Sequence, residues 1–143
     1  MKKRGKKDYR LCIFMHSGAY DRVHEGFSIA NVCLATGGEV HMLFTYGALR
    51  RLCRGKTDRF ILEKEPAPSI KEFKKHLRRG AVETISGMLK MGKKFGRLKI
   101  YACTGAMSVM NISRGELIKE VDSTVGLVGF MGLVKEADLT LYI

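Results

Sequence analysis

The sequence predicts an α/β fold in which a mainly parallel β-sheet is covered by helices on both faces. Five short apolar runs have the length of buried strands, and segments whose apolar residues recur every three or four positions separate them. Glycines and capping motifs stand where several of these helical segments begin or end. Strands that alternate with helices in this way are typical of a parallel sheet.

The first two strands are predicted over residues 11–15 and 40–45. Residues 21–36 between them have the apolar spacing of one helix face. The residues that define this face are Val23, Phe27, Ala30 and Leu34. Gly37 and Gly38 end the helix, because glycine tolerates the left-handed geometry of a helix C-terminus. A short helical segment around residues 48–53 follows the second strand.

A charged loop over residues 54–68 precedes a long predicted helix. Ser69 and Glu72 have the spacing of a capping box, in which the serine accepts from a backbone amide and the glutamate reaches back. From there to Leu89 the apolar residues recur mostly every three or four positions, which predicts one continuous helix. A basic loop then leads to a third strand over residues 98–102.

The remaining elements alternate in the same way. A helix is predicted to begin at Thr104 and to continue through Met110. Ser113 and Glu116 form a second capping box, which opens a short helix to about Glu120. A strand within residues 121–125, a helix over 126–137 and a terminal strand over 139–143 complete the prediction.

Length and hydropathy predict a basic N-terminal tail over residues 1–9 and one domain over residues 10–143. The longest uncharged run, residues 100–113, is shorter than the roughly 20 apolar residues that span a bilayer. The apolar block at residues 11–15 is too short for the core of a signal peptide. We therefore expect a cytoplasmic protein.

Positive charge is concentrated in the first two thirds of the chain. The net charge is +12; residues 1–99 carry 23 Lys and Arg against 9 Asp and Glu, whereas residues 100–143 carry 3 against 5. Such a field attracts nucleic acid, an anionic membrane or an acidic protein, although solvated basic faces that only maintain solubility look the same in a sequence. The basic clusters lie at residues 2–10, 50–59, 71–79 and 90–99.

The spacing of the four cysteines excludes the common metal and disulfide frameworks. Cys12, Cys33, Cys53 and Cys103 form no CxxC pair and no Cys/His knuckle, so we expect reduced thiols and no bound metal. The sequence also contains no GxGxxG after a strand, no GxxxxGK[ST] and no HExxH. No cofactor is therefore expected.

Cys103 stands at the junction between the third strand and the helix after it. In an open parallel sheet, functional groups gather outside the carboxyl ends of the strands. A thiolate at this junction would face the free amides of the helix start, and the small residues Thr104, Gly105 and Ala106 leave room for a partner. Position alone favours a reactive cysteine here no more than a quiet, half-buried one.

Several stretches resemble the DsrE/DsrF-like family of sulfur-relay proteins, in the same order along nearly the whole chain after the basic tail. In the second half they are IYACTGAMSVMNI at residues 100–112, GLVGF at 126–130 and ADLTLYI at 137–143. In the first half they are an early strand, IAN at 29–31, GGEV at 37–40, MLFT at 42–45 and Gly47. Ala106 stands where many relatives have serine, and Asn111 stands where glycine is common.

The resemblance implies a three-layer α/β/α sandwich around a mainly parallel five-stranded sheet, and a homo-oligomer. It also implies a persulfide-bearing cysteine, a role that maps onto Cys103, with sulfur-donor and sulfur-acceptor proteins as partners. A persulfide relay needs an accessible nucleophilic thiolate and neither metal nor nucleotide. The resemblance leaves open whether this member is an active sulfurtransferase.

Further site candidates lie at the same edge of the sheet. His16 and Ser17 end the first strand, and His16 or Tyr20 would donate to the thiolate if the first and third strands are neighbours. Thr104, Gly105 and Met107 would complete the pocket.

Cys53, between Arg51 and Arg54, has cations that favour a thiolate and is a second candidate thiol. Cys12 and Cys33 are predicted to pack in the core.

Two other functions fit the sequence. One is a non-catalytic binding module whose basic surface holds nucleic acid or an anionic membrane, although no aromatic residues interleave with the basic ones as they do in RNA-binding motifs. The other is a small-molecule or thiol redox-sensing domain in which peroxide oxidises Cys103.

Overall fold

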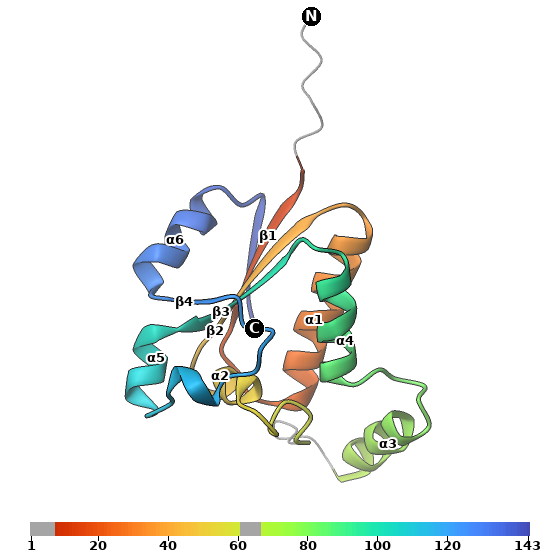
Figure 1. Ribbon diagram of the computed structural model, residues 1–143. Coiled ribbons are helices and arrows are strands. Elements are labelled where there is room, and N and C mark those ends of the chain that lie inside the picture. Colours follow the sequence, from red (N-terminus) through yellow and green to blue (C-terminus); the bar gives the residue numbers. More distant parts are fainter. Residues whose placement is uncertain (1–7, 61–66) are drawn as a thin grey trace, which may run out of the picture.

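The computed structural model describes residues 8–60 and 67–143 and contains one five-stranded, all-parallel sheet with the strand order β4-β3-β2-β1-β5 (Figure 1). The strands are β1 (Arg10–Met15), β2 (Glu39–Phe44), β3 (Leu98–Cys103), β4 (Ser123–Val125) and β5 (Leu139–Tyr142). The predicted α/β/α sandwich is confirmed. The predicted tail at residues 1–9 lies mostly outside the described residues.

Helices form the two outer layers. The α-helices are α1 (Tyr20–Ala35), α2 (Tyr46–Leu49), α3 (Ala67–Arg78), α4 (Ile85–Lys94), α5 (Thr104–Val109) and α6 (Leu127–Lys135), and the 3-10 helices are η1 (Arg50–Leu52) and η2 (Arg114–Glu116). Figure 1 shows α1 and α4 on one side of the sheet and α6 on the other. No helix among the described residues is long and apolar enough to cross a membrane.

The strand order explains this distribution of helices. From β1 to β4 the chain moves across the sheet in one direction, and after β4 it returns to place β5 on the other side of β1. Because crossovers between parallel strands are right-handed, a reversal of direction moves the connecting helix to the opposite face. The connection through α6 is therefore on the face that α1 and α4 leave uncovered.

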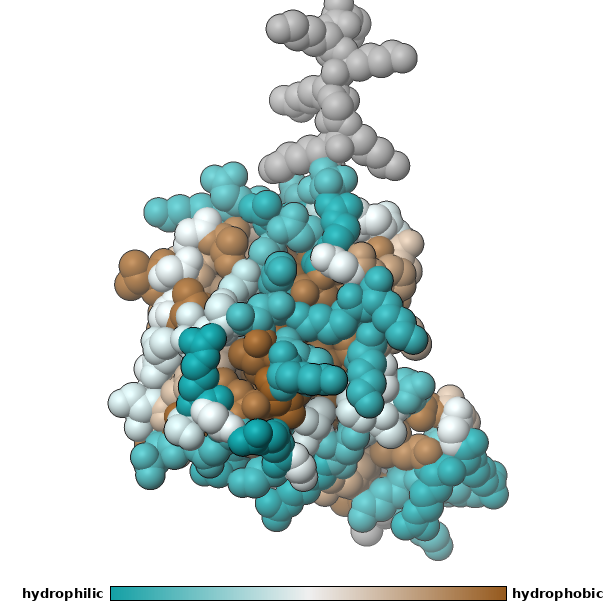
Figure 2. Space-filling model, viewed as in Figure 1, coloured by the Kyte–Doolittle hydropathy of each residue, from teal (hydrophilic) through white to brown (hydrophobic). Residues whose placement is uncertain are grey.

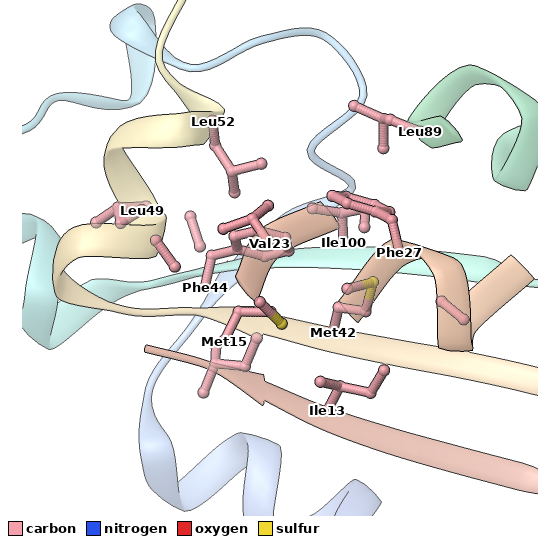
Figure 3. Close-up of a cluster of buried hydrophobic side chains, with 14 of the residues drawn as sticks. Ile13, Met15, Val23, Phe27, Met42, Phe44, Leu49, Leu52, Leu89 and Ile100 are labelled. Carbon is pink, nitrogen blue, oxygen red and sulfur yellow. The ribbon is translucent and has the colours of Figure 1, made fainter. Parts of the chain in front are cut away.

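The largest part of the core lies between the sheet and α1 with α4 (Figure 3). The face predicted for residues 21–36 is confirmed, since Val23, Phe27, Ala30 and Leu34 are all buried. Gly26 allows α1 to approach the sheet closely, because a Cβ at this position would lie 2.6 Å from the Sδ of Met15.

The prediction of one helix from Ile70 to Leu89 is wrong. The segment forms two helices, and Gly80 after the first adopts φ of +70°, a left-handed conformation that ends a helix. Thr84 then caps α4 by accepting a hydrogen bond of 3.1 Å from the amide of Gly87. Helix α3 begins at Ala67, so Ser69 lies inside the helix and is not its N-cap.

Two shorter elements also differ from the prediction. The segment expected at residues 48–53 begins earlier, at Tyr46, and changes to 3-10 geometry at Arg50. The capping box of Ser113 and Glu116 is present, but it opens only the three residues of η2, because the chain becomes extended at Leu117. Leu117 instead forms an antiparallel bridge with Cys53.

Candidate functional site

A pocket of about 480 Å³ lies at the carboxyl edge of the sheet. It is built from the ends of β1, β3 and β5 and from the segments that follow β2, β3 and β4. Its lining residues are Phe14, His16, Thr45, Tyr46, Cys103, Thr104, Gly105, Ala106, Gly126, Leu127, Val128 and Tyr142. This is the edge at which open parallel sheets bind ligands, and β1, where the order reverses, contributes to it.

Cys103 is the last residue of β3 and the N-cap of α5. Its side chain makes no capping hydrogen bond, and only 5% of the residue is exposed. A Cβ at Gly105 would lie 3.9 Å from Sγ of Cys103, in van der Waals contact with it. Because glycine has no Cβ, this space beside the thiol is free. The predicted position of Cys103 at the end of the strand is therefore confirmed. Cys103 lines the pocket, although most of its surface is buried.

Aromatic rings form part of the pocket wall. The His16 ring centroid lies 5.6 Å from that of Tyr46 and 5.8 Å from that of Tyr142, on which it stacks. The amide of His16 donates a 2.7 Å hydrogen bond to the carbonyl oxygen of Ile143, which attaches the end of β5 to the end of β1. Strand β2 separates β1 from β3, so His16 is not on a neighbouring strand of Cys103.

The structure brings some of the predicted site residues together and leaves others out. Thr104, Gly105 and His16 line the pocket with Cys103, whereas Ser17, Tyr20 and Met107 do not.

Tyr20 is buried on the other side of the β1–α1 loop, where its hydroxyl accepts a 3.2 Å hydrogen bond from the amide of Ile85. Its ring packs against Phe60 and Phe73, so its predicted role as a donor to the thiolate is wrong. Ser17 accepts a 3.2 Å hydrogen bond from the amide of Ala19 and shapes the start of α1.

The other cysteines are placed away from this pocket. Burial raises the pKa of Cys53, which outweighs the nearby charges of Lys56 and Arg50, and its thiol lies 3.9 Å from the carbonyl oxygen of Leu49. Burial raises the pKa of Cys12 to about 11, and it also raises the pKa of Cys33. Burial therefore counts against Cys53 as a thiol activated by arginines, and its role as a second thiol stays a prediction.

Thr45, Tyr46 and Tyr142 also line the pocket and were not predicted from the sequence. The rule that sites lie after strand ends would have selected Thr45 and Tyr46, since β2 ends at Phe44. Tyr142 lines the pocket because β5 pairs with β1, a long-range pairing with no local sequence signal. Within the part of the chain that the structure describes, no three His, Cys, Asp or Glu residues lie close enough to hold a metal.

Comparison with known proteins agrees with this architecture. A structure of a protein of unknown function, MTH1491 from Methanobacterium thermoautotrophicum, is similar with a TM-score of 0.62 and 13% identity, over 95% of this chain and 100% of that chain. This likeness concerns the fold. No curated protein matches the sequence. The model of the DsrE/DsrF/DrsH-like family matches residues 64–142, more than half of the chain and the part that contains Cys103. The chain belongs to the DsrE/DsrF/DrsH-like family.

Proposed function

We propose that this protein is a sulfur-relay protein that carries sulfane sulfur on Cys103 as a persulfide. The observation that carries the proposal is that Cys103 lines a pocket at the carboxyl edge of the sheet, whereas Cys12, Cys33 and Cys53 do not line it. Membership of the DsrE/DsrF/DrsH-like family supports this class of function at a coarse level.

The proposed chemistry is two successive thiol exchanges. The thiolate of Cys103 attacks the outer sulfur of a donor persulfide, forms the new S–S bond and releases the donor as a thiolate. An acceptor thiolate then attacks the outer sulfur on Cys103, takes it as its own persulfide and leaves Cys103 as a thiolate again. Neither step consumes an oxidant or a reductant, since the sulfane sulfur keeps its oxidation state.

The surroundings of Cys103 suit an exchange between two proteins. Four exposed apolar residues, Tyr46, Leu127, Val128 and Tyr142, belong to the pocket lining. A partner that covers these side chains would bury apolar surface and bring its own cysteine toward Cys103. Water excluded by such a partner could not compete with the thiol for the sulfane sulfur. We therefore propose sulfur-donor and sulfur-acceptor proteins as the partners.

The test is persulfide mapping on the folded protein. After incubation with cysteine persulfide, an alkylating agent traps the persulfides and mass spectrometry locates them on peptides. We expect the extra sulfur atom on the Cys103 peptide of the wild type and its loss in Cys103→Ala. The matched control is Cys53→Ala, which removes another cysteine with little exposed surface and should keep wild-type labelling.

Equal labelling of wild type and Cys103→Ala would contradict the proposal. A parallel incubation with dilute hydrogen peroxide separates relay from redox sensing: rapid sulfenic acid formation at Cys103 without persulfide uptake would favour the sensor.

A further inference from the structure

A second pocket, of about 270 Å³, is lined in part by the segments that follow β1 and β2. It shares no lining residue with the Cys103 pocket. Gly18 and Gly47 form part of its wall as bare backbone. They pack so closely that a Cβ on Gly18 would lie 2.5 Å from the carbonyl oxygen of Gly47. The second pocket is thus bordered by two loops whose glycines are in close contact.

The other lining residues in the described part of the chain are all basic, namely Arg50, Arg51, Lys56 and Arg59. Within residues 8–60 and 67–143, none of these four side chains forms an ion pair. The neighbouring carboxylates are bonded elsewhere: Asp58 accepts a 3.0 Å hydrogen bond from the amide of Ser86, and Glu116 accepts one of 2.7 Å from the amide of Ser113.

Arg51 is fixed in place at the centre of this group. Only 4% of the residue is exposed, and its Nε and one terminal nitrogen donate to the carbonyl oxygen of Gly18 at 2.8 and 2.6 Å. Its other terminal nitrogen donates to the carbonyl oxygen of Arg59, and the guanidinium lies 5.5 Å from the centroid of the Tyr20 ring. Three of its five N–H groups are used in this way, and all of these acceptors are neutral.

Among residues 8–60 and 67–143, no carboxylate forms a direct ion pair with this buried cation. Burial lowers the pKa of Arg51, an effect that the negative charge of Asp58 only partly offsets. Arginine stays protonated even so, because its ordinary pKa is far above neutrality. Arg50, Lys56 and Arg59 add exposed positive charge to the same small space. A bound anion would place a negative charge beside Arg51 and would reduce the electrostatic repulsion among the four cations.

We propose that this pocket binds the tetrahedral dianionic group of a small molecule, a phosphate or a sulfate. Guanidinium groups match the oxygens of such groups in geometry as well as in charge. The volume lies just under the roughly 300–1,000 Å³ of ordinary ligand pockets, which suits a small ligand. The four cations converge on one cavity, whereas a nucleic-acid surface would spread them along a backbone path. The inference goes beyond the proposed sulfur relay and does not depend on it.

Calorimetric titration of the full chain at constant ionic strength tests the proposal. The probes are inorganic phosphate, inorganic sulfate and glycerol 3-phosphate. We expect saturable binding of one anion per chain. Tighter binding of the ester would identify a phosphate ester as the ligand, and equal or tighter binding of an inorganic ion would identify a free oxyanion.

The variant Arg50→Gln/Arg59→Gln removes two exposed charges and leaves Arg51 and its carbonyl partners intact. We expect its dissociation constant to rise about tenfold or more, since hydrogen bonds to charged groups are lost. The matched control Lys90→Gln/Lys135→Gln removes two exposed charges from α4 and α6 and should change the constant less than about twofold.

Cys103→Ala should bind the anion as the wild type does, which separates this test from that of the relay. Binding without saturation, or equal weakening in the two double variants, would overturn the proposal. So would binding of a single-stranded oligonucleotide but of none of the three small anions, because the charge would then act as a general polyanion surface.

Discussion

Helices α1 and α4 lie side by side on one face of the sheet, whereas α6 lies on the other (Figure 1). On the first face the side chains of β1, β2 and β3 form a continuous buried cluster with α1 and α4 (Figure 3). On the second face Phe130 of α6 is buried against Phe14 and Tyr101, with ring centroids 5.0 and 5.8 Å away. We call the first face the closed face, because its side chains are buried, and the second the open face, because apolar side chains other than Phe130 are exposed there.

The open face carries the apolar surface that the closed face hides. Leu127, Val128 and Met131 of α6 are exposed, and Figure 2 shows hydrophobic side chains at the surface where α6 lies. Leu139 and Tyr142 of β5 are exposed as well. One nine-residue helix cannot cover five strands, so the carboxyl edge of this face keeps the space in which Cys103 lies. The comparison shows that most of the buried core lies on the face covered by α1 and α4, whereas the candidate site lies on the face of α6.

The largest expected effect tests the closed face. Phe27 is fully buried between α1 and the sheet, and Phe27→Ala should lower the free energy of unfolding by about 3–5 kcal/mol. The control on the open face is Val128→Ala, at a residue that is 91% exposed, which should change it by less than about 0.5 kcal/mol. Urea denaturation measures both. Similar losses in the two variants would remove the contrast between the faces.

The second prediction concerns which cysteine on the open face is accessible to solvent. Cys12 and Phe14 alternate with Ile13, so Cys12 shares the face of Phe14, but it has 0% exposure. With a pKa of about 11, Cys12 holds only about one thiolate in a thousand at pH 8. We expect Cys103 to be alkylated about 100-fold faster than Cys12 in the folded protein, measured by mass spectrometry of the two peptides.

Alkylation in urea is the control for this comparison. Unfolding exposes both thiols, so the two rates should approach each other. If Cys12 reacts as fast as Cys103 in the folded protein, the prediction is wrong, and the solvent-accessible space on this face of the sheet extends beneath α6 to Cys12.

The sequence predicted the elements that local patterns determine. The positions of the five strands and the buried stripe of α1 follow from the side chains of one segment at a time. The strands were placed correctly to within one or two residues at their ends, and the stripe was correct. The break at Gly80 was missed because the apolar spacing from Ile70 to Leu89 is compatible with two helices as well as one. Gly80 at positive φ and the Thr84 cap mark the break, and apolar spacing alone does not register either of them.

Only the part of the site that lies directly at the ends of predicted strands could be predicted from the sequence. Cys103 follows a clear strand, and Asn111 adopts φ of +52°, a conformation that glycine and asparagine tolerate. Tyr20 was misplaced because the direction of its side chain depends on where α4 packs. Tyr142 was missed because the pairing of β5 with β1 is not encoded in either strand alone.

The smallest expected effect concerns a polar row on the open face. His41 is buried; its Nε2 donates to the Glu39 carboxylate and its Nδ1 lies 2.9 Å from the Tyr101 hydroxyl, while Arg10 pairs with Glu39 at 3.4 Å. Burial alone would raise the pKa of Glu39, but the hydrogen bond and charge of His41, with Arg10, lower it overall.

A lowered folded-state pKa means that the charged form of Glu39 stabilises the fold above the unfolded pKa of about 4.3, and that this contribution is lost as the pH falls through the folded value. Glu39→Gln should therefore lower the free energy of unfolding by about 1–2 kcal/mol at pH 7 and by less at pH 3, measured by urea denaturation at both pH values. The control Glu136→Gln, at an exposed residue after α6, should have little effect at either pH. A loss that is equal at pH 3 and pH 7 would mean that Glu39 acts through packing, and that the polar row of the open face adds no charge-dependent stability.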